Sequence, residues 1–264
     1  MYQHIVVERS GAVATLLLNR PERRNALSLD HMTEVTAALT DLGTDPEVQT
    51  IVIAGAGPAF SAGHDIGEMV DRDQSFYDKL FDACTVMMLT IHRVPQPVIA
   101  KVHGIATAAG CQLVASCDLV VAASTATFAT PGVKIGLFCS TPMVPISRAV
   151  GRKRAMQMLL TGEPIDAETA RAWGLVNIVA EPDDLDAAVE RLSARITRFS
   201  PVTVGIGKEA FYRQVELSEP DAYALMSDVM ARNAATRDAQ EGMGAFLDKR
   251  EPVWSNAADD SRAE

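Results

Sequence analysis

The fold is decided by residues 98–112, which read VIAKVHGIATAAGCQ. The apolar run Val98–Val102 predicts a buried strand, and Thr107–Gln112 predicts the start of a short helix that continues to Ser116. A chain that turns from a strand straight into a helix points free backbone N–H groups outward, and the helix dipole adds about half a positive charge there. Because the side chains of Ala108–Gly110 are small, a ligand oxygen can approach these amides closely. The stretch therefore predicts an oxyanion-binding site.

Strands and helices alternate on both sides of this stretch. A hairpin is predicted at Ser10-Gly11, and Ser28 is the expected N-cap of a helix that closes at Gly43. A long helical stretch is expected from about Ile66 to Arg93, with a break near Arg72. The predicted strands are His4–Val7, Ala12–Leu18, Thr50–Ala54, Val98–Val102 and Asp118–Ala122. Nearly continuous apolar strands separated by helices predict an α/β fold whose parallel strands are covered on both faces.

The chain after Pro142 has a different character. It is predicted to be almost wholly helical, with only Val176–Val179 extended and a polar tail at the end. Asp166 is expected to open a helix, and Gly162 and Gly174 are expected to close helices. The last predicted helices span about 183–198, 202–215, 220–234 and 237–248. We therefore divide the chain into a core, residues 1–199, and a C-terminal helical region, residues 200–264.

Composition limits the classes of function. A chain of 264 residues that is 48% hydrophobic can bury a full core. A net charge of −10 argues against nucleic acid as a partner, and no apolar run is long enough to span a membrane. Four cysteines without C-x-x-C spacing indicate reduced thiols, and five histidines without an H-x-x-x-H pair indicate no metal site. We expect a cytoplasmic protein, or one of the mitochondrial matrix if a transit peptide has been removed.

The glycine-rich loop Gly55–Asp65 follows the predicted strand TIVIA and permits two interpretations. A dinucleotide site is one, but Phe60 stands where the third glycine of G-x-G-x-x-G belongs and Pro58 interrupts the turn. Alternatively, the His64 amide is a second hydrogen-bond donor that acts with the Ala109 amide on a thioester oxygen. Both loops also fit ordinary glycine-containing turns after buried strands.

Several motifs together resemble the crotonase (enoyl-CoA hydratase/isomerase) superfamily. Residues 59–69, AFSAGHDIGEM, resemble its A-F-x-A-G-x-D-I-x-E-M segment, and residues 104–111, GIATAAGC, resemble its G-x-A-x-G-G-G-C turn. The opening N-R-P…N-A-L is matched by Asn19–Pro21 and Asn25–Leu27. The resemblance covers about residues 3–254 and continues through Leu159–Gly162, Ala172–Val176 and Glu241–Phe246. Phe128–Ser140 and Lys249–Ser255 are most similar to one branch of the superfamily.

The resemblance implies a fold and a ligand. The fold is the ClpP/crotonase-like spiral of ββα units with a C-terminal helical trimerisation region, assembled as a homotrimer or a dimer of trimers. The ligand is a coenzyme A thioester, bound as substrate and without any other cofactor. The oxyanion hole falls on the amides of His64 and Ala109. The implied CoA contacts are Arg24, Ala26, Ala62, Asp65 and Ile66, joined by Phe246 and Lys249 of a neighbouring subunit.

Local positive charge matters for this ligand because CoA is polyanionic and the chain is acidic. Arg20, Arg23 and Arg24 would supply that charge beside the expected phosphate site. The alternative is that these arginines belong to a solvated loop.

The sequence departs from the family pattern at the two positions where hydratases carry catalytic glutamates. Gln112 stands at the first and Gly132 at the second. Neither residue transfers protons near neutral pH, and the loss of general acid–base help costs about 10²–10⁴-fold in rate. The other groups considered for proton transfer or nucleophilic attack are His64, Asp65, Glu68, His103 and Cys139, although Asp65 is expected to cap the following helix.

Three functions remain open from the sequence. The first is an acyl-CoA thioester enzyme, nominally an enoyl-CoA hydratase/isomerase of fatty-acid metabolism, which stabilises an enolate in the hole formed by the His64 and Ala109 amides. The second is a non-catalytic acyl-CoA-binding protein, and the third is a CoA thioester hydrolase or decarboxylase. Gln112 and Gly132 favour the second and third over ordinary hydration.

Overall fold

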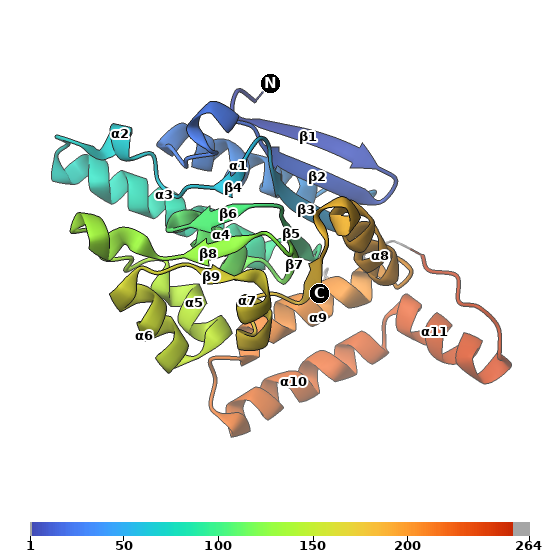
Figure 1. The fold of residues 1–264 in the computed structure, drawn as a ribbon. Coiled ribbons are helices and arrows are strands. Elements are labelled where there is room, and N and C mark those ends of the chain that lie inside the picture. The colour runs from blue at the N-terminus through green and yellow to red at the C-terminus, as the bar shows by residue number, and fades with distance from the viewer. Residues whose placement is uncertain (1, 256–264) are drawn as a thin grey trace.

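Two β-sheets form the centre of the protein, and in each sheet the strands lie side by side in the order in which they occur in the sequence (Figure 1). The computed structural model describes residues 2–255. The larger sheet has six strands in the order β1 (Ile5–Ser10), β2 (Val13–Leu18), β3 (Thr50–Gly55), β5 (Val98–Val102), β7 (Leu119–Ala123) and β10 (Ile178–Ala180). The smaller has four, in the order β4 (Ala59–Ser61), β6 (Ile105–Thr107), β8 (Thr127–Ala129) and β9 (Ile165–Asp166).

The larger sheet is parallel from β2 to β10, and β1 joins it as an antiparallel hairpin with β2. Its middle strands are covered on both faces, as predicted. In β3, for example, Ile51 and Ile53 pack into the main core with α1 (Leu29–Gly43), while Val52 packs on the opposite face with α8 (Leu185–Thr197). Alternate residues of one apolar strand thus enter two different hydrophobic clusters.

Three strands of the larger sheet are each followed at once by a short strand of the smaller sheet. β4 follows β3, β6 follows β5 and β8 follows β7, and the short strands pair with one another in parallel. These repeated pairs are the ββα units that the resemblance implies. Periodicity did not reveal β4, β6 and β8 because three residues are too few to show a strand pattern.

The predicted helices of the core are present, with local corrections. Ser28 caps α1, since its hydroxyl accepts a hydrogen bond from the His31 amide. The predicted break near Arg72 separates α2 (Ile66–Met69) from α3 (Gln74–Arg93). The extended segment expected at Val176–Val179 lies slightly later, at β10. The remaining core helices are α4 (Ala109–Ser116), α5 (Met143–Val150), α6 (Arg152–Thr161) and α7 (Ala167–Trp173), with 3-10 turns η1 (Pro21–Arg23), η2 (Pro131–Ile135) and η3 (Pro182–Asp184).

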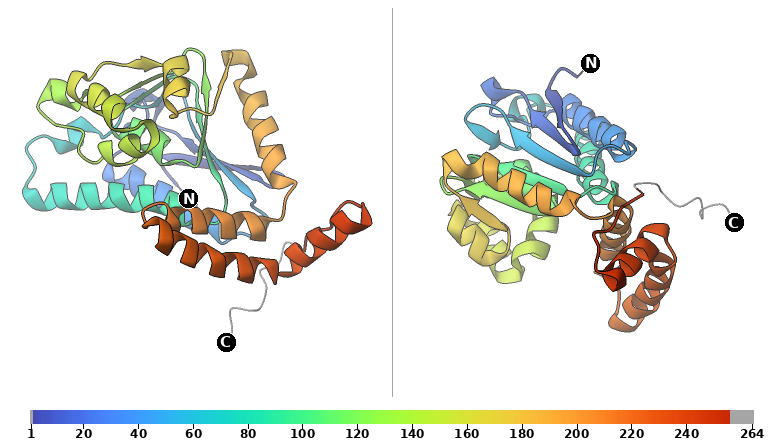
Figure 2. Two further views of the ribbon diagram at one scale, coloured as in Figure 1. Left: turned by 90° about the horizontal axis from the view of Figure 1, so that it is seen from below. Right: turned by 90° about the vertical axis from the view of Figure 1, so that its right-hand side faces the viewer.

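The C-terminal helices extend beyond the body formed by the two sheets (Figure 2). They are α9 (Pro201–Gln214), α10 (Glu219–Ala234) and α11 (Arg237–Asp248). All residues of α10 are described, and none of them is buried within the chain. The division at residues 199 and 200 stays a prediction, and residues 1 and 256–264 lie outside the described part. Within residues 2–255, no helix has the length and apolar character needed to cross a bilayer.

A buried ion pair fastens α9 to the core. Lys208 Nζ lies 2.6 Å from Asp118 Oδ2 and donates to the carbonyl oxygens of Ile91 and Gln96 at 2.7 and 2.8 Å. Tyr212 Oη donates to the other Asp118 oxygen at 2.7 Å. Both charged side chains are largely buried, at 6% and 15% exposure for Lys208 and Asp118. Every group in this cluster has a partner, as a buried ion pair requires.

Candidate active site

Two loops meet where the short strands β4 and β6 end. Gly63, after β4, has φ +89° and lies against the turn that follows β6. A Cβ atom on residue 63 would lie 2.8 Å from Ala108 Cβ and 2.9 Å from the Thr107 carbonyl oxygen. Backbone contact between the two loops therefore requires glycine at this position.

The contact brings two unused donors to the same place. The amides of His64 and Ala109 adjoin the Gly63 contact, and neither has an acceptor among the described residues. Ala109 is also the first residue of α4, where helix amides lack partners within the helix. Sequence reasoning predicted this pair of donors, and the structure brings them together.

Gly110 holds the start of α4 against β4. A Cβ atom on this residue would lie 2.3 Å from the Ser61 carbonyl oxygen and 2.8 Å from Ser61 Cβ. The helix can approach the strand this closely only without a side chain at residue 110. The Ala109 amide is therefore fixed by packing as well as by the turn before it.

The Asn19–Leu27 segment supports the loop that carries His64. The buried Asn25 side chain donates to the carbonyl oxygens of Ala56 and Ala59, both at 2.8 Å, and accepts from the Arg20 amide at 2.9 Å. The carbonyl oxygen of Arg24 accepts a hydrogen bond from the Ala62 amide at 2.9 Å. The matched N-R-P…N-A-L residues thus act as a scaffold behind the candidate site.

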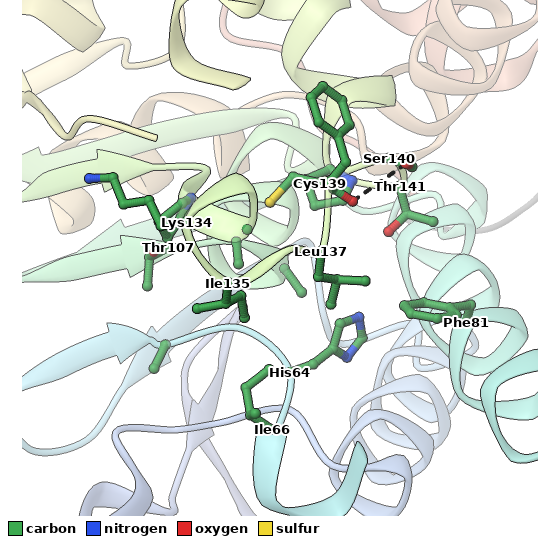
Figure 3. Close-up of a pocket in the computed structure, with 17 residues that line it drawn as sticks. His64, Ile66, Phe81, Thr107, Lys134, Ile135, Leu137, Cys139, Ser140 and Thr141 are labelled. Carbon is green, nitrogen blue, oxygen red and sulfur yellow. Dashed lines mark hydrogen bonds between the residues drawn. The ribbon is translucent and has the colours of Figure 1, made fainter. Parts of the chain in front are cut away.

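A cavity of about 510 Å³, a size typical of small-molecule sites, opens beside the two amides (Figure 3). Its lining comes from the two loops, from Phe81 of α3 and from the segment after β8. The lining residues are Ala62, His64, Ile66, Phe81, Thr107, Ala108, Ala109, Pro131, Gly132, Lys134, Ile135, Leu137, Phe138, Cys139, Ser140, Thr141 and Pro142. None of these described residues is an aspartate or a glutamate. Most of the cavity wall is apolar.

The His64 side chain lies at the edge of this cavity, beside Phe81 and Leu137 (Figure 3). Its ring meets the Phe81 ring edge-on, with centroids 5.4 Å apart. Both ring nitrogens are buried, and the Leu27 backbone interacts with the ring. Burial lowers the pKa of His64 below its usual value, so the neutral imidazole is favoured near pH 7.

The side chains of Thr107 and Cys139 also line the cavity. Thr107 Oγ1 is buried and, within residues 2–255, lacks a partner. Cys139 is buried, and burial raises the pKa of its thiol, which keeps it protonated and weakly nucleophilic. Thr107 begins the stretch predicted to bind an oxyanion, although its side chain was not singled out, and Phe81 was not predicted as a cavity residue. Phe81 could not be found by motif, because it reaches the site from the middle of α3.

The structure places Gln112 away from the cavity wall. Its side chain is buried, and its Oε1 accepts a weak hydrogen bond from Cys84 Sγ of α3 at 3.7 Å. Gln112 does not line the cavity, although the preceding turn of α4 does. The residue at the first expected glutamate position therefore contacts a helix of the core.

Gly132 lines the cavity, but Leu137 and Cys139 of the following loop pack directly against its Cα. A Cβ atom on residue 132 would lie 1.9 Å from the Leu137 carbonyl oxygen and 2.8 Å from Cys139 Sγ. The Gly132 carbonyl oxygen also accepts a hydrogen bond from the Leu137 amide at 3.0 Å. This conformation has no room for any side chain at the second expected glutamate position.

The prediction that the Asp65 side chain caps α2 is wrong. Asp65 occupies the N-cap position, but its carboxylate makes no capping hydrogen bond and instead lies 3.1 Å from Arg20 Nη2. Arg20 also donates to the Ala26 carbonyl oxygen at 2.8 Å. The ion pair is favoured over the cap because it joins two largely buried charges of opposite sign. The pair also compensates the charge of Arg20, whereas the positive charges of Arg23 and Arg24 remain available in this loop.

Two further candidates have partners away from the cavity. Glu68 accepts a hydrogen bond from the Leu29 amide at 3.0 Å, at the start of α1. His103 Nε2 lies 2.8 Å from the Gly57 carbonyl oxygen. Neither residue lines the cavity, and both fix neighbouring loops.

The predicted CoA contacts divide into two groups. Ala62 and Ile66 line the cavity, whereas Arg24, Ala26 and Asp65 lie in or beside the supporting segment. Phe246 is 82% exposed on α11, and Lys249 follows the end of that helix in a left-handed conformation. Neither lines the cavity of its own chain. Their role at the site of a neighbouring subunit stays a prediction.

The turn before α4 carries backbone strain that a substitution can release. Ala108 has φ +51° and ψ −119°, a conformation that suits glycine and costs other residues about 1–3 kcal/mol. We expect Ala108→Gly to raise the free energy of unfolding by about 1 kcal/mol, after about 0.4–1 kcal/mol is lost to the greater freedom of the unfolded chain. Urea unfolding measures the change, and a destabilised variant would show that residue 108 is unstrained.

Comparison with known proteins places this geometry in a family. The sequence model described as "Enoyl-CoA hydratase/isomerase" matches residues 8–257. A relative from Xenopus laevis, "Enoyl-CoA hydratase domain-containing protein 3, mitochondrial", is 43% identical over 253 residues, which cover 96% of this chain and 86% of that protein. A Danio rerio protein of the same name is 44% identical over 255 residues, covering 96% and 88%.

Solved structures agree with the sequence relatives. An enoyl-CoA hydratase from Mycobacterium smegmatis is 48% identical and superposes with a TM-score of 0.94, covering 96% of this chain and 99% of that one. Human enoyl coenzyme A hydratase domain-containing protein 3 is 42% identical with a TM-score of 0.93, covering 96% and 100%. The fold and the branch indicated by Phe128–Ser140 and Lys249–Ser255 are thereby confirmed.

Proposed function

The chain belongs to the enoyl-CoA hydratase/isomerase family, and on that basis we propose that it binds an acyl-CoA thioester with the carbonyl oxygen between the amides of His64 and Ala109. One observation carries the proposal. Two amides without acceptors among the described residues adjoin one glycine contact at the wall of an apolar cavity. An oxyanion there would be stabilised by about 2.7–4 kcal/mol per donor.

The chemistry that this site supports is stabilisation of an enolate oxygen. As the α-carbon of a bound thioester gains negative charge, the carbonyl oxygen takes up much of it, and two fixed donors lower the energy of that state. Hydration also needs one group to deprotonate water and another to protonate carbon. The absence of carboxylates from the described cavity lining favours thioester binding without ordinary hydration. A non-catalytic acyl-CoA-binding protein is therefore the second candidate.

We extend the proposal to the assembly and the CoA end. The arm formed by α9–α11 exposes large apolar side chains, including Phe211, Tyr223, Met230 and Leu247. Such a surface suits a subunit interface, which supports the homotrimer or dimer of trimers expected from the family. In that assembly Phe246 and Lys249 of one subunit would reach the CoA of the next. The names of the Xenopus and Danio relatives include the word mitochondrial, which supports a mitochondrial location over a cytoplasmic one.

Calorimetric titration with two ligands tests the proposed function. Butyryl-CoA carries the thioester carbonyl, whereas the thioether S-butyl-CoA has the same chain without that oxygen. Loss of two hydrogen bonds predicts that the ester binds about 10- to 100-fold more tightly. Equal affinities would contradict a role for the two amides, and no binding of either ligand would contradict the CoA site itself.

A carboxylate introduced at residue 132, the second expected glutamate position, is predicted to destabilise the protein without restoring hydration. Because a Cβ at residue 132 would overlap the Leu137 carbonyl, we expect Gly132→Glu to lower the free energy of unfolding by about 3 kcal/mol. We also expect no gain in hydration of crotonyl-CoA, with or without Gln112→Glu. Val133→Glu adds the same charge at an exposed neighbour and should change stability much less. A stable Gly132→Glu variant that hydrates crotonyl-CoA would contradict this view of the loop.

A further inference from the structure

Helix α11, at the far end of the C-terminal arm, has few buried side chains of its own (Figure 1). Of its 12 residues, only Asp238 and Ala245 are buried within the chain. Phe246 and Leu247, near its C-terminal end, are exposed. Because a helix with so little apolar burial gains little free energy from packing, other contacts must fix its orientation.

These contacts come from the segment that follows the helix, residues 250–255, which we call the clasp. Lys249 adopts the left-handed conformation, which ends α11 and turns the chain back (Figure 1). Arg250 then donates from Nη1 and Nη2 to the two carboxylate oxygens of Glu241, at 2.6 and 2.9 Å. The Val253 amide donates to the same carboxylate at 2.8 Å. The clasp thus holds Glu241 with three hydrogen bonds, two of them in the bidentate geometry of a strong arginine–carboxylate pair.

The end of the clasp ties α11 to the connection between α8 and α9. Trp254 Nε1 donates to the carbonyl oxygen of Arg198, directly after α8, at 2.8 Å. The Trp254 ring covers Gly242 of α11, where a Cβ atom would lie 3.3 Å from two ring carbons. Asp238 of α11 accepts a hydrogen bond from Ser200 Oγ, directly before α9, at 2.5 Å. The position of α11 therefore depends on the clasp and on this connection.

The end of α11 that the clasp fixes carries two side chains that are free to contact another molecule. Phe246 is exposed, and the Lys249 ammonium has no hydrogen bond or ion pair among residues 2–255. An exposed aromatic ring can stack on a base, and an ammonium can pair with a phosphate. Coenzyme A carries both groups at its nucleotide end. Because Arg250 directly follows Lys249, a change in the clasp shifts both side chains relative to such a ligand.

We propose that Glu241, Arg250 and Trp254 are positioning residues for the nucleotide end of coenzyme A. The clasp holds α11 so that Phe246 and Lys249 reach the ligand bound by a neighbouring subunit. This role rests on the proposed function, because the thioester must occupy the site of that subunit. The three positioning residues do not touch the ligand and act through the orientation of the helix.

Calorimetric titration with two thioesters tests this role. Butyryl-CoA contains the nucleotide, and butyryl-pantetheine has the same acyl chain and pantetheine arm without it, so the ratio of their affinities measures the contribution of the nucleotide end. For the wild-type protein we expect a ratio of about 10 or more. Arg250→Met and Trp254→Phe each remove hydrogen bonds of the clasp, and each should lower the ratio about 5-fold. The affinity for butyryl-pantetheine should keep its wild-type value.

Two further variants show whether the loss acts through the end of α11. Arg148→Met is the matched control, because Arg148 Nε donates to Glu216 at 2.6 Å in an exposed pair of the same chemistry that does not include α11. The ratio should be unchanged in this control. Lys249→Met should itself lower the ratio, and Arg250→Met added to it should cause little further loss, because both substitutions affect the same contact.

Sedimentation velocity shows whether each variant keeps the wild-type oligomeric state. Clasp variants that bind the two esters with the wild-type ratio would overturn the positioning role, as would an equal loss of affinity for both esters or dissociation of the assembly. If the wild-type protein binds the two esters equally, the positioning role fails while the proposed thioester site stands. If it binds neither ester, both fail.

Discussion

A Gly63→Ala variant is expected to bind butyryl-CoA about 100-fold more weakly than the wild-type protein, as the loss of two hydrogen bonds predicts. Its new Cβ would lie 2.8 Å from Ala108 Cβ and 2.9 Å from the Thr107 carbonyl oxygen, which forces the two donor loops apart. Alanine at φ +89° adds backbone strain of about 1–3 kcal/mol. Calorimetry measures the affinity, and urea unfolding shows that the variant is folded at the temperature used.

Gly207→Ala is the control for this variant. A Cβ at residue 207, in α9, would meet no atom within 4 Å, so the same chemical change should leave thioester affinity unaltered there. The helical position also predicts a small gain in stability. A folded Gly63→Ala variant with wild-type affinity would show that the contact between the two loops does not form the binding site.

Lys208→Met is expected to cause the largest loss of stability, about 3–5 kcal/mol in the free energy of unfolding. The substitution keeps much of the side-chain volume but leaves the Asp118 carboxylate buried without a cation. It also removes the donor to the carbonyl oxygens of Ile91 and Gln96. Urea unfolding followed by circular dichroism measures the loss.

Lys101→Met is the matched control for this ion pair. Lys101 pairs with Asp186 at 2.7 Å, but Asp186 is 76% exposed, so water screens the interaction and the loss should stay below about 1 kcal/mol. Asp118→Asn combined with Lys208→Met should recover part of the stability, because it removes the unpaired charge. Equal losses in the two single lysine variants would show that the cluster does not fasten α9 to the core.

Sequence reasoning placed the two donor loops shortly after buried apolar strands, and the family resemblance singled out the His64 and Ala109 amides within them. Such strands are recognised by their composition, and the turns that follow them must lie at one edge of a parallel sheet. Helix ends were predicted for a similar reason, since Ser28 and Asp166 cap helices through hydrogen bonds to nearby residues. These features depend on interactions between residues that are close together in the sequence.

Features that depend on contacts between distant residues were not predicted. Asp65 pairs with Arg20, 45 positions away, although its local context indicated a helix cap. The side chain of Gln112 contacts Cys84 on another helix, which no motif could indicate. The lack of space at residue 132 arises from the path of the loop at Leu137. In each case tertiary packing decides what a recognised motif position can do.

Infrared difference spectroscopy of bound butyryl-CoA, labelled with ¹³C at the thioester carbonyl, tests whether the amides of His64 and Ala109 hold the carbonyl oxygen. Two fixed N–H donors in an apolar cavity polarise the C=O bond, so its stretching frequency should be lower in the complex than in water. The label identifies this band among those of the protein. A bound ester whose carbonyl frequency equals or exceeds its value in water would contradict an oxyanion hole at these two residues.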